Sequence, residues 1–249
     1  MRAAKVVIGA ATASFRHPFF VVGRQPTFDM PPPSTIFGHC ASALGRWPAR
    51  SEFWFGIHFT FRSRARDLEH QHVTTSLSQA SRIFVPTAEG PARATTEVSV
   101  QPVLRDFLFG VRMTLYLPLV FADAFRNPVY PVVLGRSQDL AEIERVEEID
   151  LVVHDRARLE HTLLPQSLRP GVTAGTTALL SRFVGEPPER PAEFAQYIIL
   201  HEPVFVGGPG DSPRTFIHFD GADLGALRCD PTERDDEGYY RGVWIHRLD

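Results

Sequence analysis

One stretch of the chain, residues 53–61, alternates strictly between large apolar side chains and smaller or polar ones. Because successive side chains of a strand point to opposite faces, this alternation predicts a β-strand with one buried face. A second alternating stretch, residues 5–15, predicts another strand. The chain therefore has to build a sheet that is covered on at least one side.

The segments around these strands predict the rest of an α+β domain. Residues 34–44 predict a helix with Ser34 as its N-cap and Gly45 closing it. Further strands are expected at 107–117 and 149–153, a short helix between 118 and 127, and a turn of helix at 140–148. Strand, helix, strand, strand, helix, strand is the element order of a ferredoxin-like fold.

Two regions depart from this pattern. Residues 63–102 are polar and rich in arginine, threonine and serine, and they predict an extended hairpin or arm in which 83–85 pair with 98–100. From 156 to 249 the chain is punctuated by proline and glycine, with strands expected at 194–206, 215–219 and 239–247. The predicted organisation is a domain over 1–155 followed by a β-rich subdomain over 156–249.

The net charge of −3 hides a strong asymmetry. Residues 1–136 carry a balance of +7 and residues 137–249 a balance of −10, which predicts two different surfaces for partners. Of the 26 basic residues 25 are arginine, and the only lysine, Lys5, is expected just before the first strand. Arginine suits phosphates and base edges, but the codon usage of a GC-rich genome explains the same bias.

Several classes of protein are excluded or disfavoured. No apolar run approaches the roughly 20 residues of a membrane-spanning helix. Two cysteines, Cys40 and Cys229, cannot form a disulfide framework or a four-ligand zinc site, which favours a reducing cytoplasm. The common nucleotide-binding, metalloprotease and esterase motifs are missing. His70 and His72 would share one face of a strand but have no third ligand nearby, so no metal or cofactor is expected.

Two features of the residues themselves suggest anion binding. The arm carries a series of arginines that would lay positive charge along one edge, although charge also protects an edge strand from aggregation: Arg62, Arg64, Arg66, Arg82 and Arg93. The backbone N–H groups at the start of the predicted helix, from Ser34 to Ile36, would suit a phosphate. A capped helix with no ligand is the alternative for the second feature.

Four blocks of sequence together resemble a known family. The segments 14–16, 25–28, 31–38 and 41–45 resemble the N-terminal signature of the Cas-five family, the CRISPR-associated RAMP-superfamily subunits of type I Cascade complexes. Residues 103–108 are similar to the family's Arg-acidic-aromatic-Leu element, residues 130–137 to its Leu-Gly-Arg block, and residues 242–248 to its C-terminal strand. The blocks occur in the expected order over nearly the whole chain, and subtype I-B is the most similar.

The resemblance implies a ferredoxin-like, RRM-related domain with a protruding hairpin, the thumb, at 63–102, and a smaller C-terminal β unit. It implies a non-catalytic subunit of a ribonucleoprotein complex in antiviral defence, which caps the 5′ handle of the CRISPR RNA (crRNA). Its partners would be the backbone and large subunits, with target DNA met only through the complex. The expected RNA contacts are Arg16, Arg24, Ser34, Thr35, His39 and Arg46, then Arg105 and Arg136, with Arg64, Arg66 and Arg82 on the thumb.

Two other functions stay open. Family members of subtype I-C cut precursor RNA without metal at a Tyr-Lys-His site, and such a site is not reproduced here, since no lysine follows Lys5 and no tyrosine precedes Tyr116. An endoribonuclease would need His39 or His17 as the base that activates the 2′-hydroxyl. The remaining alternative is a protein–protein scaffold whose arginines reflect codon usage alone.

Overall fold

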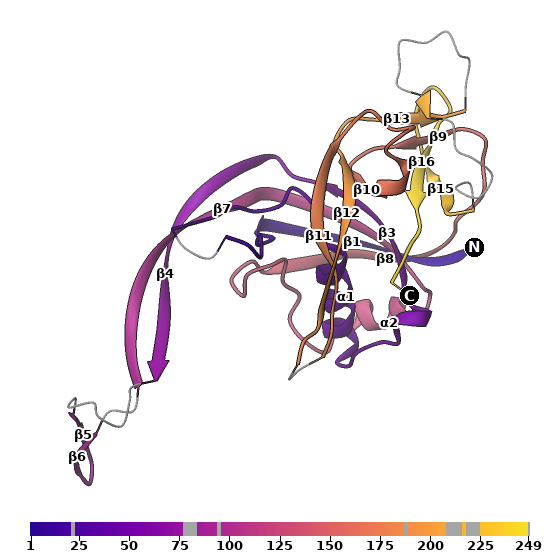
Figure 1. Ribbon diagram of the computed structural model, residues 1–249. Coiled ribbons are helices and arrows are strands. Elements are labelled where there is room, and N and C mark those ends of the chain that lie inside the picture. The colour runs from indigo at the N-terminus through magenta and orange to yellow at the C-terminus, as the bar shows by residue number, and fades with distance from the viewer. Residues whose placement is uncertain are drawn as a thin grey trace.

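An antiparallel sheet frames the molecule and extends on one side into a long hairpin (Figure 1). This computed structural model describes residues 1–20, 23–76, 84–93, 96–186, 189–207, 216–217 and 225–248. The frame strands lie in the order β17 (His246–Arg247), β3 (Trp54–Thr60), β7 (Thr96–Leu117), β1 (Arg2–Ala13) and β8 (Ala141–Asp150). Every pair of neighbours in this order is antiparallel.

Two α-helices pack on one face of the frame. Helix α1 (Pro33–Leu44) connects β1 to β3 through a short 3₁₀ turn, η1 (Arg50–Glu52), and α2 (Phe121–Arg126) connects β7 to β8. The apolar side chains of both helices share a core with those of the frame. Gly45 closes α1 in the left-handed conformation, at φ 72°, as the sequence predicts.

Two predictions about these elements are wrong. Residues 141–150 form strand β8 instead of a turn of helix. Their glutamates favour helix weakly, but pairing with β1 outweighs that local preference. Ser34 is not the N-cap: α1 already begins at Pro33, and Pro32 precedes it without a side-chain cap. Proline has the backbone angle that the first helical residue needs, so the helix begins two residues earlier than a Ser34 N-cap would place it.

The polar stretch 63–102 forms most of the hairpin. Strand β4 (Ser63–Ser76) pairs with β7 along its whole length, from Ser63 opposite Phe109 to Ser76 opposite Thr96. Beyond it, β5 (Phe84–Thr87) pairs with β6 (Gly90–Arg93). The expected pairing of 83–85 with 98–100 is wrong, because residue 100 pairs with residue 72 and residue 85 with residue 92. The short strand β2 (Arg24–Gln25) lies along β7 near the base of the hairpin.

A second sheet covers the other side of α1. It consists of β10 (Thr162–Pro165), β12 (Ala192–Leu200) and β11 (Thr176–Val184), and a 3₁₀ turn, η2 (Gln166–Leu168), follows β10. Figure 1 shows β11 and β12 crossing in front of α1. Phe37 of α1 contacts Phe183 of β11 with ring centroids 5.2 Å apart. The helix is therefore held between two sheets.

A third sheet covers the end of the frame opposite the hairpin. Its strands are β14 (Phe216–Ile217), β13 (Val204–Val206), β9 (Ala157–Leu159), β16 (Tyr240–Trp244) and β15 (Leu227–Arg234), in this spatial order. The strands expected at 194–206, 215–219 and 239–247 correspond to β12 with β13, to β14, and to β16 with β17. No helix in the described ranges is long and apolar enough to cross a membrane.

A buried ion pair joins this third sheet to the frame. Lys5 lies within β1 and not before it, and its ammonium is 2.7 Å from a carboxylate oxygen of Asp230 and 2.9 Å from one of Glu233. The hydroxyl of Tyr116 donates to Asp230 at 2.8 Å. The side chains of Lys5 and Asp230 are 1% and 0% exposed.

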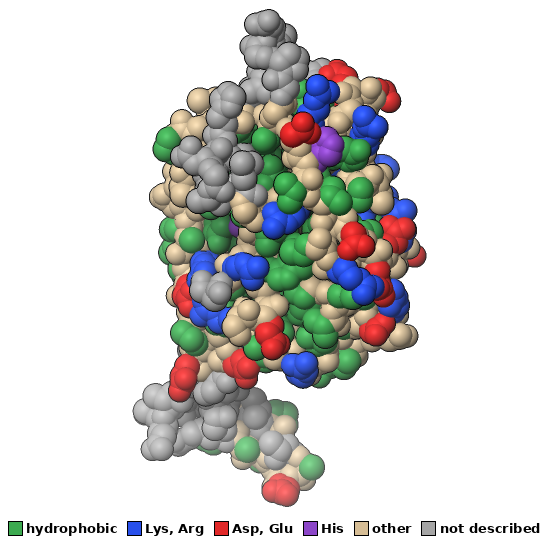
Figure 2. Space-filling model, turned by 90° about the vertical axis from the view of Figure 1, so that its right-hand side faces the viewer, with side chains coloured by type: hydrophobic (Ala, Val, Ile, Leu, Met, Phe, Trp, Pro, Cys, Tyr) green, Lys and Arg blue, Asp and Glu red, His purple; other side chains and the backbone are tan. Residues whose placement is uncertain are grey.

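Ion pairs between residues 1–136 and residues 137–249 neutralise part of the charge asymmetry. Besides Lys5, Arg50 pairs with Glu193 and Arg2 with Glu148. Figure 2 views the molecule from the side opposite the hairpin and shows acidic and basic side chains interspersed across that face. The basic first half and the acidic second half therefore neutralise one another in part within the fold.

Candidate functional site

A cavity of about 520 Å³ runs along one side of α1, from Pro32 to Ser42. One wall is the exposed side of α1, and another is the end of β1 with the residues that follow it. The third is the loop before β8 together with one arginine of β7. Five predicted RNA-binding residues line this cavity: Arg16, Thr35, His39, Arg105 and Arg136. Sequence positions more than 100 residues apart therefore meet at one place.

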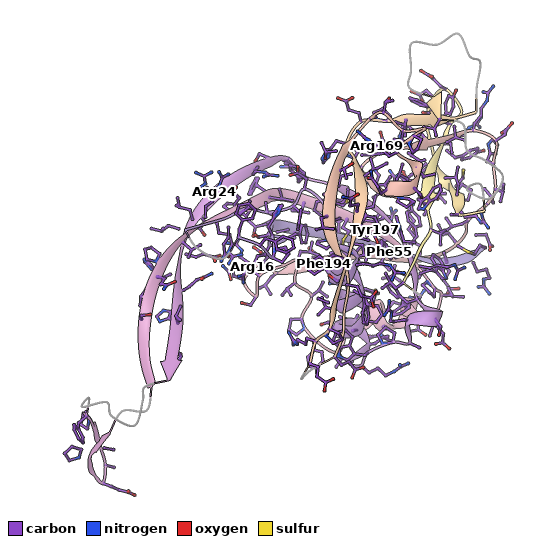
Figure 3. The ribbon with its side chains drawn as sticks, viewed as in Figure 1. Arg16, Arg24, Phe55, Arg169, Phe194 and Tyr197 are labelled. Carbon is purple, nitrogen blue, oxygen red and sulfur yellow. The ribbon has the colours of Figure 1, made fainter. Side chains whose placement is uncertain are left out.

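Arg16 is the most available cation of this cavity. Its side chain is exposed and makes no ion pair with any residue that the structure describes. The backbone of Arg16 forms an isolated bridge with Thr27, which holds the loop after β1 against the cavity wall. Figure 3 shows Arg16 and Arg24 on the side of the body from which the hairpin projects. A free guanidinium at this position can donate to a phosphate or to a base edge.

His39 brings an unsatisfied polar atom to the same cavity. Its ring is only 9% exposed, it hydrogen-bonds the backbone of Val133, and its Nε2 has no partner among the described residues. Burial lowers the pKa of His39 to about 4, so the ring is neutral at pH 7. Because a buried polar atom without a partner is unusual, it marks a position where a ligand would complete the hydrogen bonding.

Two buried arginines meet on one carboxylate at the back of the cavity. Glu69 of β4 accepts from Arg105 at 2.5 Å and from Arg136 at 2.7 Å. Burial would raise the pKa of Glu69, but the hydrogen bonds from Arg136 and Arg105 outweigh it and hold that pKa below its ordinary value. Arg136 also donates to the buried Asp139 at 2.8 Å, and this bond raises the pKa of Arg136. The network fixes both guanidinium groups in place.

A glycine makes the approach of Arg136 possible. Gly135 has φ +106°, a conformation that side chains rarely allow. A Cβ on this glycine would lie 2.0 Å from the carbonyl oxygen of Ser14. The loop can therefore pack against the end of β1 only with glycine at this position, which explains the Leu-Gly-Arg block in physical terms.

Three further predicted arginines lie beside the cavity, at the base of the hairpin. Asp106, which is 2% exposed, accepts from Arg24 at 2.7 Å and from Arg66 at 2.9 Å. Arg64 pairs with Asp29. The side chains of all three arginines are between 39% and 55% exposed while they are paired. They can therefore contact a ligand only while sharing their charge with these carboxylates.

The remaining predicted contacts are not brought together. Arg46 is exposed just beyond the C-terminal end of α1, about 18 Å along the helix from its start. The Ser34 hydroxyl is 2.5 Å from that of Ser181 in β11. The N–H groups of Thr35 and Ile36 already donate to the carbonyl of Pro32, which weakens the expected anion site. Arg82 lies outside the described residues.

The other histidine considered as a catalytic base is His17. His17 stacks on Phe28 with ring centroids 3.5 Å apart, and burial, followed by the charge of Arg64, lowers its pKa. His70 and His72 occupy alternate positions of β4, as expected. Within the described part of the chain, no three histidine, cysteine or acidic side chains are grouped so that they could hold a metal ion.

Sequence reasoning missed the carboxylates of this site. Glu69 and Asp139 hold Arg105 and Arg136, yet neither was singled out. The three-residue spacing of Arg136 and Asp139 was a usable signal, because it allows a local ion pair. Nothing in the sequence places Glu69 against Arg136, since that contact depends on the register of the hairpin.

Comparison with known proteins agrees with the sequence resemblance. The model of the family described as CRISPR-associated protein (Cas_Cas5) matches residues 6–189. The chain belongs to this family. A comparison with curated proteins gave no match.

The chain also matches solved structures at low sequence identity, with TM-scores below 0.5. A chain of a "CRISPR RNA-guided surveillance complex" is 19% identical, with 84% of this chain and 95% of that chain covered and a TM-score of 0.46. A CRISPR protein from Archaeoglobus fulgidus is 12% identical, with 99% of both chains covered and a TM-score of 0.43. A chain of a type III-B Cmr-beta complex bound to cognate target RNA is 10% identical, with 80% and 85% covered and a TM-score of 0.41.

Proposed function

We propose that this protein is a non-catalytic RNA-binding subunit of a type I CRISPR surveillance complex, in which it caps the 5′ handle of the crRNA. One observation carries the proposal: Arg16, whose guanidinium makes no ion pair with any described residue, and His39, whose Nε2 has no partner among those residues, line the same cavity as Arg105 and Arg136. These groups offer donors for phosphates and base edges, which is how single-stranded RNA is recognised. Family membership supports this reading.

The arrangement of the chain fits the proposed role. The strand order β3-β7-β1-β8 with α1 and α2 on one face supports a ferredoxin-like, RRM-related domain. We assign the β4–β7 hairpin as the thumb, and a subdomain boundary near residue 155, because β9 begins at Ala157. The RNA would lie on the hairpin side, and the acidic C-terminal part would face the backbone and large subunits. Target DNA would be met only through the complex.

The test measures RNA retention and RNA cleavage together. Purified protein in EDTA is incubated with a labelled repeat RNA and, separately, with the mature handle RNA. We expect retention of the handle without cleavage, and retention that weakens as the salt concentration rises. Arg16→Ala should weaken retention about tenfold or more, on the scale of one lost charge-assisted contact. Arg46→Ala is the matched control, because Arg46 is also exposed but does not line the cavity.

Two results would contradict the proposal and favour another function. A single discrete cleavage product in EDTA would favour the endoribonuclease, and its loss in His39→Gln or His17→Gln would identify the base. No retention of either RNA by the folded protein would favour the scaffold.

A further inference from the structure

A larger cavity, of about 810 Å³, lies on the other face of the frame, beside the base of the hairpin. Its floor is formed by β1, β7 and β3 at residues Gly9, Arg112 and Thr60, which are direct neighbours across the strands. These positions alternate along the strands with Ile8, Met113 and Phe59, which are buried in the core under the helices. The cavity therefore lies on the face that the helices leave uncovered.

Two arginines line this cavity. Arg62 is exposed and has no ion-pair partner in the described part of the chain. Its alkyl chain lies so close to Gly110 that a Cβ there would be 2.7 Å from the Arg62 Cδ. Arg112 is 57% exposed and is held by Glu144 at 2.8 Å, across Gly9. The cavity thus combines one free cation with one cation restrained by a single carboxylate.

An exposed aromatic ring lines the same cavity as these two cations. Phe109 is 46% exposed although it belongs to a central strand. Gly110 has φ +64° and interrupts the alternation, so that Leu108 and Val111 are both buried and Phe109 is turned outward. Such an irregularity re-aims a side chain and is frequent beside binding sites. Leaving the ring exposed forgoes burial free energy, which a stacked ligand would restore.

We infer that this second cavity binds an unpaired RNA nucleotide on the 3′ side of the handle, with its base on Phe109 and its phosphates at Arg62 and Arg112. The inference rests on the proposed function. Stacking on an aromatic ring beside a positively charged groove is the common means of holding a single strand without reading its sequence. The site would therefore accept any base that follows the handle.

The two cavities are placed to hold one strand. Residues 9–11 of β1 line the second cavity, and residues 14–16 line the first. Ala11 and Ser14 are separated by about 10 Å along the strand. The segment before β8 also lines both cavities, with Arg136 in the first and Leu140 in the second. If the 5′ end occupies the first cavity, the RNA can continue only in the 3′ direction.

Glu144 provides a test that increases binding. It neutralises Arg112, so its replacement by glutamine would remove a negative charge and free a cation for phosphate. We expect Glu144→Gln to bind tighter than the unmodified protein and to have a salt slope steeper by about 0.7, the value for one additional phosphate contact. Structural defects usually weaken binding, so a structural defect in Glu144→Gln would not explain tighter RNA binding.

The experiment compares two RNAs on the full chain: the handle alone, and the handle extended by four nucleotides. We expect the extended RNA to bind tighter than the handle alone. Phe109→Ala should reduce this gain in affinity by about five-fold to a hundred-fold, which is the range for one base stacked on a ring. Arg62→Ala should reduce the same difference and should leave the handle alone unaffected. Arg145→Gln is the control, since Arg145 is 50% exposed on β8 but does not line this cavity.

The outcomes separate this inference from the proposed function. Handle binding that depends on Arg16, with no gain from the extension or with a gain that Phe109→Ala and Arg62→Ala leave intact, overturns the inference alone. No binding of either RNA overturns both. Equal gain from a DNA extension overturns the assignment to RNA, and failure of Glu144→Gln to tighten binding overturns the role of Arg112.

Discussion

The ammonium of Lys5 on β1 lies 2.7 Å from a carboxylate oxygen of Asp230 on β15, and solvent reaches almost none of either side chain. Burial alone would raise the pKa of Asp230, but hydrogen bonds from Lys5, Thr232 and Tyr116 outweigh it, and the pKa lies below its ordinary value. The pair joins two strands that are more than 220 residues apart and fixes the third sheet on the frame.

Breaking this pair should be far more costly than breaking an exposed one. We expect Lys5→Met to lower the free energy of unfolding by about 3–5 kcal/mol, because Asp230 is left as a buried charge without its cation. Arg2→Met, in the same strand, removes a pair whose arginine is 67% exposed and should cost less than about 1 kcal/mol. Urea unfolding measures both, and equal losses would contradict the argument.

Stability should fall as the pH falls below neutrality. Burial lowers the pKa of His246 to about 4, well below its unfolded value near 6.5. The unfolded chain therefore binds a proton that the folded chain does not, and stability is full above pH 6.5 and declines down to about pH 4. His246 alone contributes about 1.4 kcal/mol per pH unit in this window. Burial lowers the pKa values of His39 to about 4 and of His58 to about 3, so these act in the same direction.

The slope of stability against pH, and not its level, tests this point. His246→Phe also loses the hydrogen bond with the carbonyl of Leu163, so stability at pH 7 should fall too. The slope of the unfolding free energy against pH, between pH 6.5 and 4.5, should nevertheless decrease by the amount that corresponds to about one bound proton. His70→Gln, on the hairpin, serves as the control, and an unchanged slope in His246→Phe would refute the assignment.

The loop that carries Arg136 should tolerate no side chain at Gly135. Gly135→Ala would place a Cβ against the Ser14 carbonyl in an unfavourable backbone conformation, and we expect a loss of about 2 kcal/mol or more. Under the proposed function, RNA retention should fall as well, because Arg136 moves out of the cavity. Gly23→Ala is a control for the backbone angle, since φ is +77° there but the added Cβ meets nothing within 4 Å. Equal effects would mean that the contact with Ser14 is unimportant.

The salt dependence of RNA binding should be modest for so arginine-rich a chain. Most arginines near the first cavity are already paired, with Glu69, Asp106 and Asp139 as the main acceptors. With about two or three phosphates contacted, one by Arg16 and the others by the exposed parts of paired arginines, the slope of log affinity against log salt should be roughly −1.4 to −2.1. Titration of a labelled handle RNA at several salt concentrations measures it. A slope near −6 would mean that RNA displaces the carboxylates from the paired arginines.

Local patterns predicted the elements whose formation depends on neighbouring residues. The strand at 53–61 and the helix ending at Gly45 are confirmed, because alternation and a C-terminal glycine act within a few residues. Strand β8 was missed, since a glutamate-rich segment becomes a strand only by pairing with β1. The burial of Lys5 was missed for the same reason, because its partner is distant in the sequence.

The candidate site was predictable to a similar extent. Arg16, Thr35 and His39 belong to one short region of the sequence, and the structure brings them to one cavity. Arg46 was grouped with them by sequence proximity, but it does not line the cavity. Glu69, which restrains Arg105 and Arg136, could not be predicted, because its pairs depend on the register of the hairpin. Of the residues that line the second cavity, the sequence analysis singled out Arg62 alone.

The burial of Lys5 also determines how the protein responds to chemical labelling. It is the only lysine, and both cysteines, Cys40 and Cys229, are buried with their thiol pKa values raised by burial. The folded chain therefore offers amine-reactive and thiol-reactive reagents almost no side chain, apart from the α-amino group. Unfolded molecules expose all three side chains at once. Incorporation of such a reagent would then count the unfolded fraction directly, and immobilisation or crosslinking through lysine would select against the native protein.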